Sequence, residues 1–320
     1  MAKNVTIFGG SGFVGRYIVR NLVREGWSVT VAVRNPDAAA FLVKEAPEGQ
    51  VRAIEGDILS DASVSAALEK ADCVVNCVGT FDMRGTNNFV SIQQDGATRI
   101  ARFAVEAGLS RMVHLSSIGA SEASSSVYSQ TKARGEAGVL AHVPDAIILR
   151  PSVIFGPEDQ FFNRFAKLSK LAPVLPVVGA QTRFQPVYVG DVAEAAALAV
   201  KGDVPPGIYE LGGPDVMAFG DLMNLMLTHI ERKRPLFDIP LPLARPMAFG
   251  MDSVARITGG LIPAQITPDQ VRSLQSDNVV SPHAQTLSDL GIAPTPLADV
   301  LPEYLWRYTR SGKPPSPASA

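Results

Sequence analysis

Short apolar runs alternate with amphipathic segments over the first two thirds of the chain. The runs, which are typical of buried strands, occupy residues 5–8, 28–33, 51–54, 73–78, 111–115, 146–149 and 208–211. Apolar residues at helical spacing separate them, most clearly at residues 13–23, 88–107, 128–140 and 191–200. Strands that alternate with helices form a parallel sheet covered on both faces. We therefore expect an α/β fold built on a doubly wound parallel sheet.

The last third of the chain departs from this alternation and predicts a smaller, mainly helical C-terminal domain. Apolar residues form three helical faces, namely Leu222, Leu225, Met226 and Ile230; Leu243, Met247, Met251, Val254 and Leu261; and Leu301, Leu305 and Tyr308. Pro246 and Gly250 interrupt the second face, and residues 237–242 read as an extended piece. Methionine-rich faces pack in a core more often than on a surface. Next to the basic residues 232–234, the same stretch also fits a membrane-proximal docking surface.

Composition narrows the class of protein. The chain has 320 residues, of which 46% are hydrophobic, and a net charge of −2, which is typical of a soluble globular protein. No basic run indicates nucleic-acid binding, and no apolar run reaches the roughly 18 residues of a membrane span. The first strand begins close to Met1, so we expect no signal or transit peptide.

Cys73 and Cys77 are the two cysteines of the chain. On a strand they would share a face roughly 13 Å apart, which is too far for a disulfide bond. We expect buried thiols in a reducing compartment. Because no histidine lies near them in sequence, we expect no metal site.

A glycine-rich turn follows the first predicted strand and opens the first predicted helix. Gly9, Gly12 and Gly15 are three residues apart. Such glycines let the backbone turn sharply and approach a pyrophosphate, whose charge the helix N-terminus stabilises. An ordinary βα turn is the alternative. We expect nucleotide binding through Gly9, Ser11, Gly12, Phe13, Val14, Gly15 and Arg16.

The end of the second predicted strand distinguishes the two nicotinamide cofactors. Sites for NAD usually carry a carboxylate there, about 20 residues past the glycines, to bind the ribose 2′-hydroxyl. Here the position holds Arg34, and Arg16 follows the glycine turn. Two guanidiniums suit a 2′-phosphate, which a carboxylate would repel. We expect NADPH or NADP; Asp37 keeps NAD as the less favoured alternative.

Further polar residues follow later strands. Asp57 could accept a hydrogen bond from an adenine amino group, or it could cap the helix that begins near Ser63. Ser116 and Ser117 follow the fifth strand, at the edge where ligands of open parallel sheets bind. Asp191 is expected to be the N-cap of the helix over residues 191–200.

Tyr128 and Lys132 are four residues apart within a predicted helix, so they share one face. A tyrosine acts as a general acid or base only if its pKa falls well below about 10. A neighbouring ammonium and a cationic nicotinamide both lower it. With Ser117 eleven residues upstream, the pattern predicts a Ser-Tyr-Lys site.

Together these segments resemble the short-chain dehydrogenase/reductase superfamily, in its extended and atypical branch. The matching marks lie at residues 9–15, 56–58, 76–79, 116–117, 128–132, 150–151 and 187–192. The resemblance implies a Rossmann fold whose cofactor is also contacted by Ile58, Cys77, Gly79, Ser116, Pro151 and Val153. It further implies that Lys132 holds the ribose and tunes Tyr128, and that Ser117 orients a carbonyl.

A closer resemblance is to the dehydrogenase-like accessory subunit of respiratory complex I. It rests on residues 124–128, 144–159, 161–165, 185–189 and 289–297, the last of which lies in the C-terminal part. That family implies tightly held NADPH, a structural or assembly role, and a place on the peripheral arm near the membrane and the quinone site. The expected location is the cytoplasmic face of a bacterial inner membrane, or the mitochondrial matrix side for a processed chain.

Two functions from different classes therefore remain open. The first is an NADPH-binding accessory subunit of NADH:ubiquinone oxidoreductase, in which Ser117, Tyr128 and Lys132 mainly anchor the cofactor. The second is a freestanding NADP-dependent oxidoreductase or nucleotide-sugar epimerase, in which Tyr128 transfers the proton. We expect a Rossmann domain over residues 1–156 and 185–215, a substrate-like or docking domain over 157–184 and 216–311, and a disordered tail over 312–320.

Overall fold

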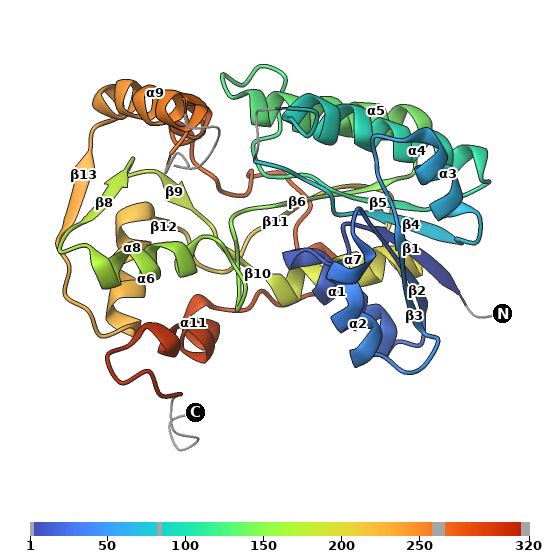
Figure 1. Cartoon of the computed structure of the whole chain (residues 1–320), viewed down its shortest axis with the longest axis horizontal. Helices are drawn as coiled ribbons and strands as arrows, with labels where there is room; N and C mark the ends of the chain where they lie inside the picture. Colours follow the sequence, from blue (N-terminus) through green and yellow to red (C-terminus); the bar gives the residue numbers. More distant parts are fainter. Residues whose placement is uncertain (1–2, 82–84, 258–265, 315–320) are drawn as a thin grey trace. The chain divides into compact units, whose positions relative to one another are not determined.

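The computed structural model of the chain describes residues 3–81, 85–257 and 266–314. They form two compact units (Figure 1), unit 1 with Met1–Pro151, Val189–Leu211 and Val280–Pro294, and unit 2 with Ser152–Tyr188, Gly212–Val279 and Thr295–Ala320. Residues 280–294 belong to unit 1, whereas the expected boundaries put them in the second domain. The physical reason is a backbone pairing in which the Glu210 N–H donates to the Gln285 carbonyl at 2.8 Å.

Unit 1 is built on a seven-stranded sheet in the order β11-β6-β5-β4-β1-β2-β3, and every neighbouring pair is parallel. The strands are β1 (Asn4–Phe8), β2 (Ser28–Val33), β3 (Val51–Glu55), β4 (Cys73–Asn76), β5 (Met112–Leu115), β6 (Ile147–Pro151) and β11 (Gly207–Leu211). One face carries α1 (Phe13–Arg24), α2 (Ala40–Glu45) and α7 (Val189–Lys201), and the other carries α3 (Asp61–Leu68), α4 (Ala97–Glu106) and α5 (Val127–His142). The expected doubly wound α/β fold is confirmed.

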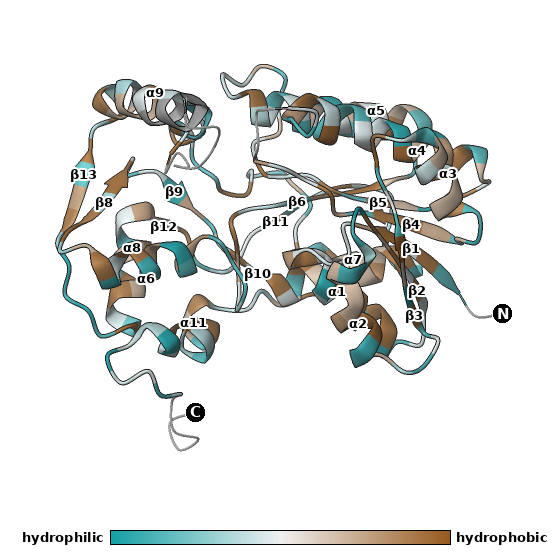
Figure 2. Ribbon diagram, viewed as in Figure 1, coloured by the Kyte–Doolittle hydropathy of each residue, from teal (hydrophilic) through white to brown (hydrophobic). Residues whose placement is uncertain are grey.

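Helices cover both faces of the sheet, which explains why most residues of its central strands are apolar. All four residues of β4 and all four of β5 are buried, and the sheet is coloured mainly as hydrophobic in Figure 2. The flanking helices are amphipathic instead. On α1, for example, Ile18, Val19 and Leu22 face the core.

Two helices of unit 1 differ from the expectation. The segment expected as one helix over residues 88–107 contains a π-helical stretch, Val90–Gly96, that leads into α4. The spacing of apolar residues in a sequence does not distinguish a π-helical turn from an α-helical one. The helix α7 begins at Val189, so Asp191 lies in its first turn and is not its N-cap. The carboxylate still lies where the helix dipole favours negative charge.

Unit 2 packs short strands and helices around its own apolar core. Its described strands pair as β10 (Val187–Tyr188) with β7 (Ile154–Phe155), β12 (Met217–Ala218) with β9 (Arg183–Phe184), and β13 (Leu236–Ile239) with β8 (Leu175–Val178). The core lies between these and α6 (Phe162–Leu171), α8 (Phe219–His229) and α11 (Leu297–Leu305). Leu222 and Met226 of α8 and its C-cap residue, Ile230, are fully buried. The helix α11 continues into the 3₁₀ turn Trp306–Tyr308. The described part of the expected last helix is therefore confirmed.

The second methionine-bearing face lies on α9 (Leu241–Ile257), which runs through Pro246 and Gly250 without interruption. Pro246 comes early in the helix and removes only one backbone hydrogen bond there. Ala244 and Ala248 are buried, while Leu243 and Met247 are exposed. Leu261, and residues 315–320 of the expected tail, lie outside the described residues. Among the residues that the structure describes, no helix has the length and apolar character needed to cross a bilayer.

A close backbone contact of α5 leads to a prediction about stability. A Cβ added at Gly135 of α5 would lie 2.1 Å from the carbonyl oxygen of Gln93, whereas one at Gly250 of α9 would meet nothing within 4 Å. We expect Gly135→Ala to lower the free energy of unfolding by about 2 kcal/mol, because the backbones must separate. Gly250→Ala is the matched control and should be neutral or slightly stabilising, since alanine favours helix. Urea denaturation of both variants checks this; equal stabilities would contradict it.

Candidate functional site

The expected ligand-binding residues of unit 1 gather at one edge of the sheet. Gly9 follows β1, Arg34 follows β2, Asp57 follows β3, Gly79 follows β4 and Ser116 follows β5. Because all these strands are parallel, their carboxyl ends lie at the same edge.

The glycine turn has the conformation that the sequence predicts. Gly9 has φ +78°, and the Gly12 N–H donates to its carbonyl at 3.0 Å. A Cβ at Gly15 would lie 2.4 Å from the same carbonyl oxygen, so only glycine permits this packing. The helix α1 begins at Phe13, and its N-cap, Gly12, provides no side-chain hydrogen bond. The positive end of the helix dipole is therefore available to an anion.

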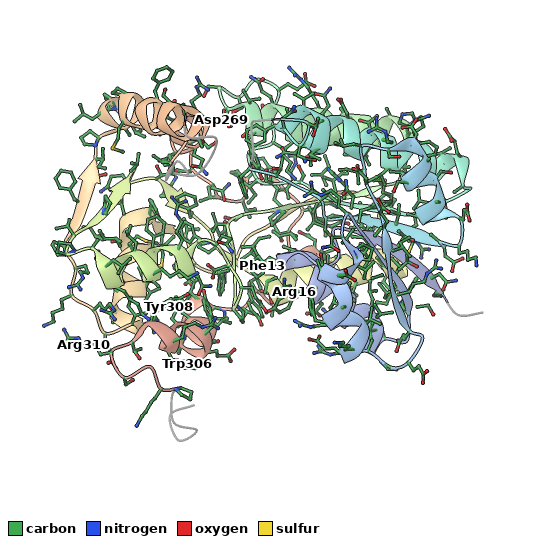
Figure 3. The ribbon with its side chains drawn as sticks, viewed as in Figure 1. Phe13, Arg16, Asp269, Trp306, Tyr308 and Arg310 are labelled. Carbon is green, nitrogen blue, oxygen red and sulfur yellow. The ribbon has the colours of Figure 1, made fainter. Side chains whose placement is uncertain are left out.

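The two arginines expected near a 2′-phosphate have different surroundings. Arg16, labelled with Phe13 in Figure 3, donates through Nε to the Gly12 carbonyl at 3.1 Å and through Nη2 to the Ser11 carbonyl at 3.0 Å. It braces the turn. Arg34 is exposed, and the described part of the chain provides it with no hydrogen bond or ion pair. Arg34 is therefore the better placed of the two to meet a ligand.

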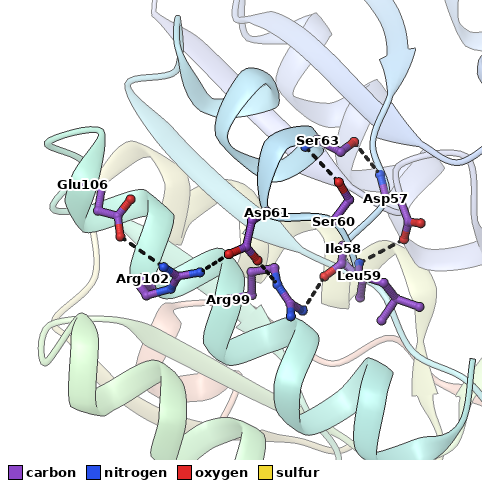
Figure 4. Close-up of polar contacts among 9 residues, drawn as sticks. All are labelled: Asp57, Ile58, Leu59, Ser60, Asp61, Ser63, Arg99, Arg102 and Glu106. Atoms are coloured by element: carbon purple, nitrogen blue, oxygen red, sulfur yellow. Dashed lines mark hydrogen bonds and ion pairs between the residues drawn. The ribbon is translucent and has the colours of Figure 1, made fainter. Parts of the chain in front are cut away.

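The loop after β3 is held by its own hydrogen bonds (Figure 4). The Leu59 N–H donates to Asp57 Oδ1 at 2.9 Å, and the Asp57 N–H donates to Ser63 Oγ at 2.9 Å. The N-cap of α3 is Ser60, which accepts from the Ser63 N–H at 3.3 Å. The alternative that Asp57 caps this helix is wrong, and its role toward adenine stays a prediction.

Arg99, which the sequence alone did not identify, holds the same loop in place. Arg99 of α4 donates to the Ile58 carbonyl at 2.9 Å and to Asp61 Oδ1 at 2.5 Å (Figure 4). Arg102 binds the other carboxylate oxygen of Asp61 at 2.7 Å. The hydrogen bonds from these two guanidiniums lower the pKa of Asp61. Ile58 is therefore held from the neighbouring helix, a long-range contact that no local motif indicates.

Lys132 is buried at the strand edge and, among the residues that the structure describes, makes one hydrogen bond, from Nζ to the Leu115 carbonyl at 3.0 Å. Burial lowers the pKa of Lys132 to about 8, while Glu136 and Cys77 act in the opposite direction. The spacing on α5 thus brings Lys132 beside the end of β5, as expected. An ammonium has three donors, so two of them remain for a ligand.

Tyr128 lies one turn before Lys132 on α5, but its pKa moves in the direction opposite to the one that catalysis requires. Burial raises the pKa of Tyr128 above its ordinary value, and the Ser117 hydroxyl lowers it by less. The protein's own residues therefore favour a protonated Tyr128.

Two phenylalanines, neither identified from the sequence, surround the Tyr128 ring. Phe81 stacks on it with ring centroids 5.4 Å apart and an interplanar angle of 8°. Phe89 meets it edge-on at 5.7 Å. Phe89 is 5% exposed, whereas Phe81 is 72% exposed. Phe81 follows Cys77 and Gly79 in the loop after β4, and no spacing rule connects it with Tyr128.

The residues at this edge fit a nicotinamide dinucleotide. The Ser116 hydroxyl is buried and has no hydrogen-bond partner among the described residues. The glycine turn presents the open N-terminus of α1 to a pyrophosphate. Lys132 and Tyr128 could hold the nicotinamide ribose, and Arg34 a phosphate on the other ribose. When bound, the nicotinamide would supply a hydride for exchange with a carbonyl carbon.

The remaining residues that we expect to contact the cofactor belong to both units. Pro151 is the last residue of β6, and Cys77 follows β4 with its thiol pKa raised to about 12 by burial. Both belong to unit 1. Val153 belongs to unit 2, where it packs against the apolar core. Its contact with the cofactor stays a prediction.

The lowered pKa of Lys132 predicts how stability depends on pH. Between about 8 and 10.5, the unfolded lysine keeps a proton that the folded one has lost. Unfolding therefore takes up a proton, and the contribution of Lys132 to stability must rise with pH over this range. We expect the free energy of unfolding of the wild type, relative to Lys132→Met, to increase from pH 8 to 10. Denaturant titrations without nucleotide measure it; a flat or falling difference would refute the assignment.

Comparisons with known proteins place this site in a family. Residues 5–212 match the model of the NAD dependent epimerase/dehydratase family. NADH dehydrogenase (ubiquinone) 1 alpha subcomplex subunit 9, mitochondrial, from Arabidopsis thaliana is 34% identical over 96% of this chain and 78% of its own. The protein of the same name from Rattus norvegicus is 33% identical over 95% of this chain and 80% of its own.

The fold recurs among solved structures. The crystal structure of gox2253 covers 95% of this chain and 98% of its own with a TM-score of 0.73, at 23% sequence identity. The subunit 9 proteins cover a similar share of the chain at a higher sequence identity, 34% and 33%, and this match likewise extends over both units. This protein belongs to the NAD dependent epimerase/dehydratase family and, within it, to the family of subunit 9 of the NADH dehydrogenase (ubiquinone) 1 alpha subcomplex.

Proposed function

We propose that this protein is an accessory subunit of respiratory complex I that binds NADPH and retains it rather than turning it over. The observation that carries the proposal is the 34% identity with the Arabidopsis subunit over 96% of the chain. An unrelated epimerase would share the glycine turn but has no reason to share the C-terminal residues. The structural or assembly role follows from that relationship.

Arg34 supports NADPH over NADH. It lies exposed at the end of β2 without a protein partner in the described part of the chain. A guanidinium there would bind a 2′-phosphate through charge-assisted hydrogen bonds. Asp37, the nearest carboxylate along the chain, lies in the first turn of the 3₁₀ helix Pro36–Ala39, whose N-cap is Asn35.

Tyr128 supports retention of the cofactor. A general acid must give up its proton and take it back near neutral pH, and burial raises the pKa of Tyr128 instead. The stacked Phe81 ring covers one face of Tyr128 as well. In this role Ser117, Tyr128 and Lys132 anchor the cofactor.

The alternative function is a freestanding NADP-dependent oxidoreductase or nucleotide-sugar epimerase. The observation that favours it is the presence of Ser117, Tyr128 and Lys132 together at the strand edge. Tyr128 would protonate the carbonyl oxygen as the hydride reaches the carbonyl carbon, and Ser117 would orient that oxygen. This reading requires a bound cofactor to lower the Tyr128 pKa.

Unit 2 supports a location at the membrane, next to peripheral-arm subunits near the quinone site. Leu243 and Phe249 of α9 are 63% and 64% exposed, and Phe237 of β13 is 61% exposed. Three consecutive cations, at residues 232–234, precede β13. Exposed apolar side chains on α9 and β13, together with cations that come just before β13 in the sequence, are features from which we infer contact with anionic lipid. The side would be the cytoplasmic face of a bacterial inner membrane or the mitochondrial matrix side.

The role of Arg34 is tested by Arg34→Asp. We expect the dissociation constant for NADPH to rise about tenfold or more, because a carboxylate would replace a charge-assisted partner of the 2′-phosphate. NADH should bind no more weakly than before. Arg310→Asp is the control, because it changes the charge equally on an exposed arginine of unit 2. Fluorescence titration of both nucleotides measures this; unchanged NADPH affinity in Arg34→Asp would remove the basis for preferring NADPH.

The assembly role is tested by purification from native membranes under mild detergent. We expect the protein to migrate with the catalytic subunits of complex I and to hold NADPH in a near 1:1 ratio after gel filtration. Recovery as a free protein whose bound NADPH is oxidised stoichiometrically by a carbonyl compound would support the alternative function instead.

A further inference from the structure

An open cationic cavity lies in unit 2, beside the C-terminal end of α8. Its volume is about 360 Å³, and it is lined by Asn224, Leu227 and Thr228 of α8 and by residues 232–235, which follow the helix. Among the described residues that line it, three are cations and none is a carboxylate. A cavity with walls of one charge concentrates ligands of the opposite charge, so this one attracts an anion.

The turn after α8 positions these cations. The Glu231 N–H donates to the Thr228 carbonyl at 3.1 Å, and the Arg232 N–H donates to the Leu227 carbonyl at 3.0 Å. These two bonds form a Schellman motif, which places a left-handed residue, usually glycine, directly after the C-cap. Here that residue is Glu231, with φ +55°, a conformation that is unfavourable for a residue with a Cβ. Backbone strain of this kind is frequent at functional sites.

Two of the cations are held by backbone carbonyls instead of carboxylates. Arg232 Nε donates to the Tyr308 carbonyl at 3.1 Å, and Arg234 Nε donates to the Ser169 carbonyl at 3.0 Å. Over the described ranges of the chain, no ion pair forms with either arginine or with the exposed Lys233. A guanidinium has five N–H donors, so each arginine keeps several for a ligand. The positive charge of the cavity is therefore held in place but not neutralised.

Exposed apolar side chains lie next to the cavity. Ser169, whose carbonyl holds one of the arginines, comes two residues before Leu171, the last residue of α6. Leu171 is 88% exposed, the highest value among the large apolar side chains that the structure describes. Phe237 is 61% exposed and lies two residues after Pro235, whose carbonyl accepts from the Leu175 N–H at 3.0 Å. A soluble anion needs no apolar surface, whereas a phospholipid presents phosphate and hydrocarbon together.

We propose that the cavity binds the phosphate group of an anionic phospholipid, with Leu171 and Phe237 against its glycerol and acyl region. The two guanidiniums bind the phosphate oxygens through charge-assisted hydrogen bonds, and Lys233 adds its charge. An acidic segment of a partner protein would use the cations but leave Leu171 in water. The proposal rests on the proposed location at a membrane and names the lipid class that unit 2 recognises there.

The test is flotation of the purified full chain with phosphatidylcholine vesicles that contain or lack phosphatidylglycerol. We expect phosphatidylglycerol to raise the partition coefficient about tenfold or more, since three cations face the lipid. Lys233→Gln and Leu171→Ser should each lower it about fivefold, through lost charge and lost apolar contact. Both side chains are exposed, so thermal unfolding of the variants should match the wild type.

The matched controls are Lys44→Gln and Val105→Ser, which make the same kinds of change at exposed residues of unit 1; both should leave the partition coefficient unchanged. Glycerol 3-phosphate should release the wild type from vesicles at an ionic strength at which sodium chloride does not, because it occupies the phosphate site. Release by both salts alike would mean a diffuse charge effect and would overturn the proposal.

Equal binding to vesicles with and without phosphatidylglycerol would overturn the proposal as well. So would tight binding of a glutamate-rich peptide that Leu171→Ser leaves unchanged, because it would assign the cavity to a protein partner. A chain that binds the vesicles as expected but is absent from purified complex I would contradict only the proposed function. The two failures are therefore distinguishable.

Discussion

The close packing of α5 on the π-helical stretch is the constraint on which the site depends. At Gly135 the two backbones meet without an intervening side chain, and at Gly138 an added Cβ would overlap Thr98 Oγ1. This approach allows Lys132 to reach the Leu115 carbonyl and Gln93 to reach Thr131. A helix displaced by one side chain would lose both contacts. The position of Tyr128 therefore depends mainly on the backbone contact between α5 and the π-helical stretch, and less on the interactions of its own side chain.

A largely buried ionic network holds the middle of the same helix. Arg150 of β6 donates to both carboxylate oxygens of Glu136, at 2.9 and 2.6 Å, and lies 3.5 Å from Glu210 of β11. The hydrogen bond with Glu136 raises the pKa of Arg150. Buried ion pairs of this kind add little net stability but favour one arrangement of the elements that they join. Glu136 lies one turn after Lys132, and its charge raises the pKa of that lysine.

The doubly wound fold and the residues that belong to local motifs could be predicted from the sequence. Parallel strands and the glycine turn depend on short-range patterns, and the resemblance to known families extended this to Tyr128 and Lys132. Sequence reasoning missed Phe81, Gln93 and Arg99, because each acts on a residue 38 to 47 positions away, through Tyr128, Thr131 and Ile58. Of the two alternatives for Asp57, the cap of α3 is wrong because Ser60 is the N-cap, and Asp191 is not an N-cap because α7 begins two residues before it. Sequence patterns identify helices and strands, whereas contacts between distant helices and strands determine how the side chains of the site are arranged.

The division of the chain has a consequence for how the protein is made. Unit 1 is discontinuous, and the buried carboxylate of Glu210 accepts from the Ser281 N–H at 2.8 Å. On a ribosome, β6 and β11 emerge long before residues 280–294 are available to complete their edge. The nucleotide-binding sheet therefore reaches its final hydrogen bonding only when nearly all of the chain has been translated. A chain that ends before residue 280 lacks the segment that pairs with β11, so its nucleotide-binding sheet keeps an unpaired edge strand of the kind that can pair with another chain.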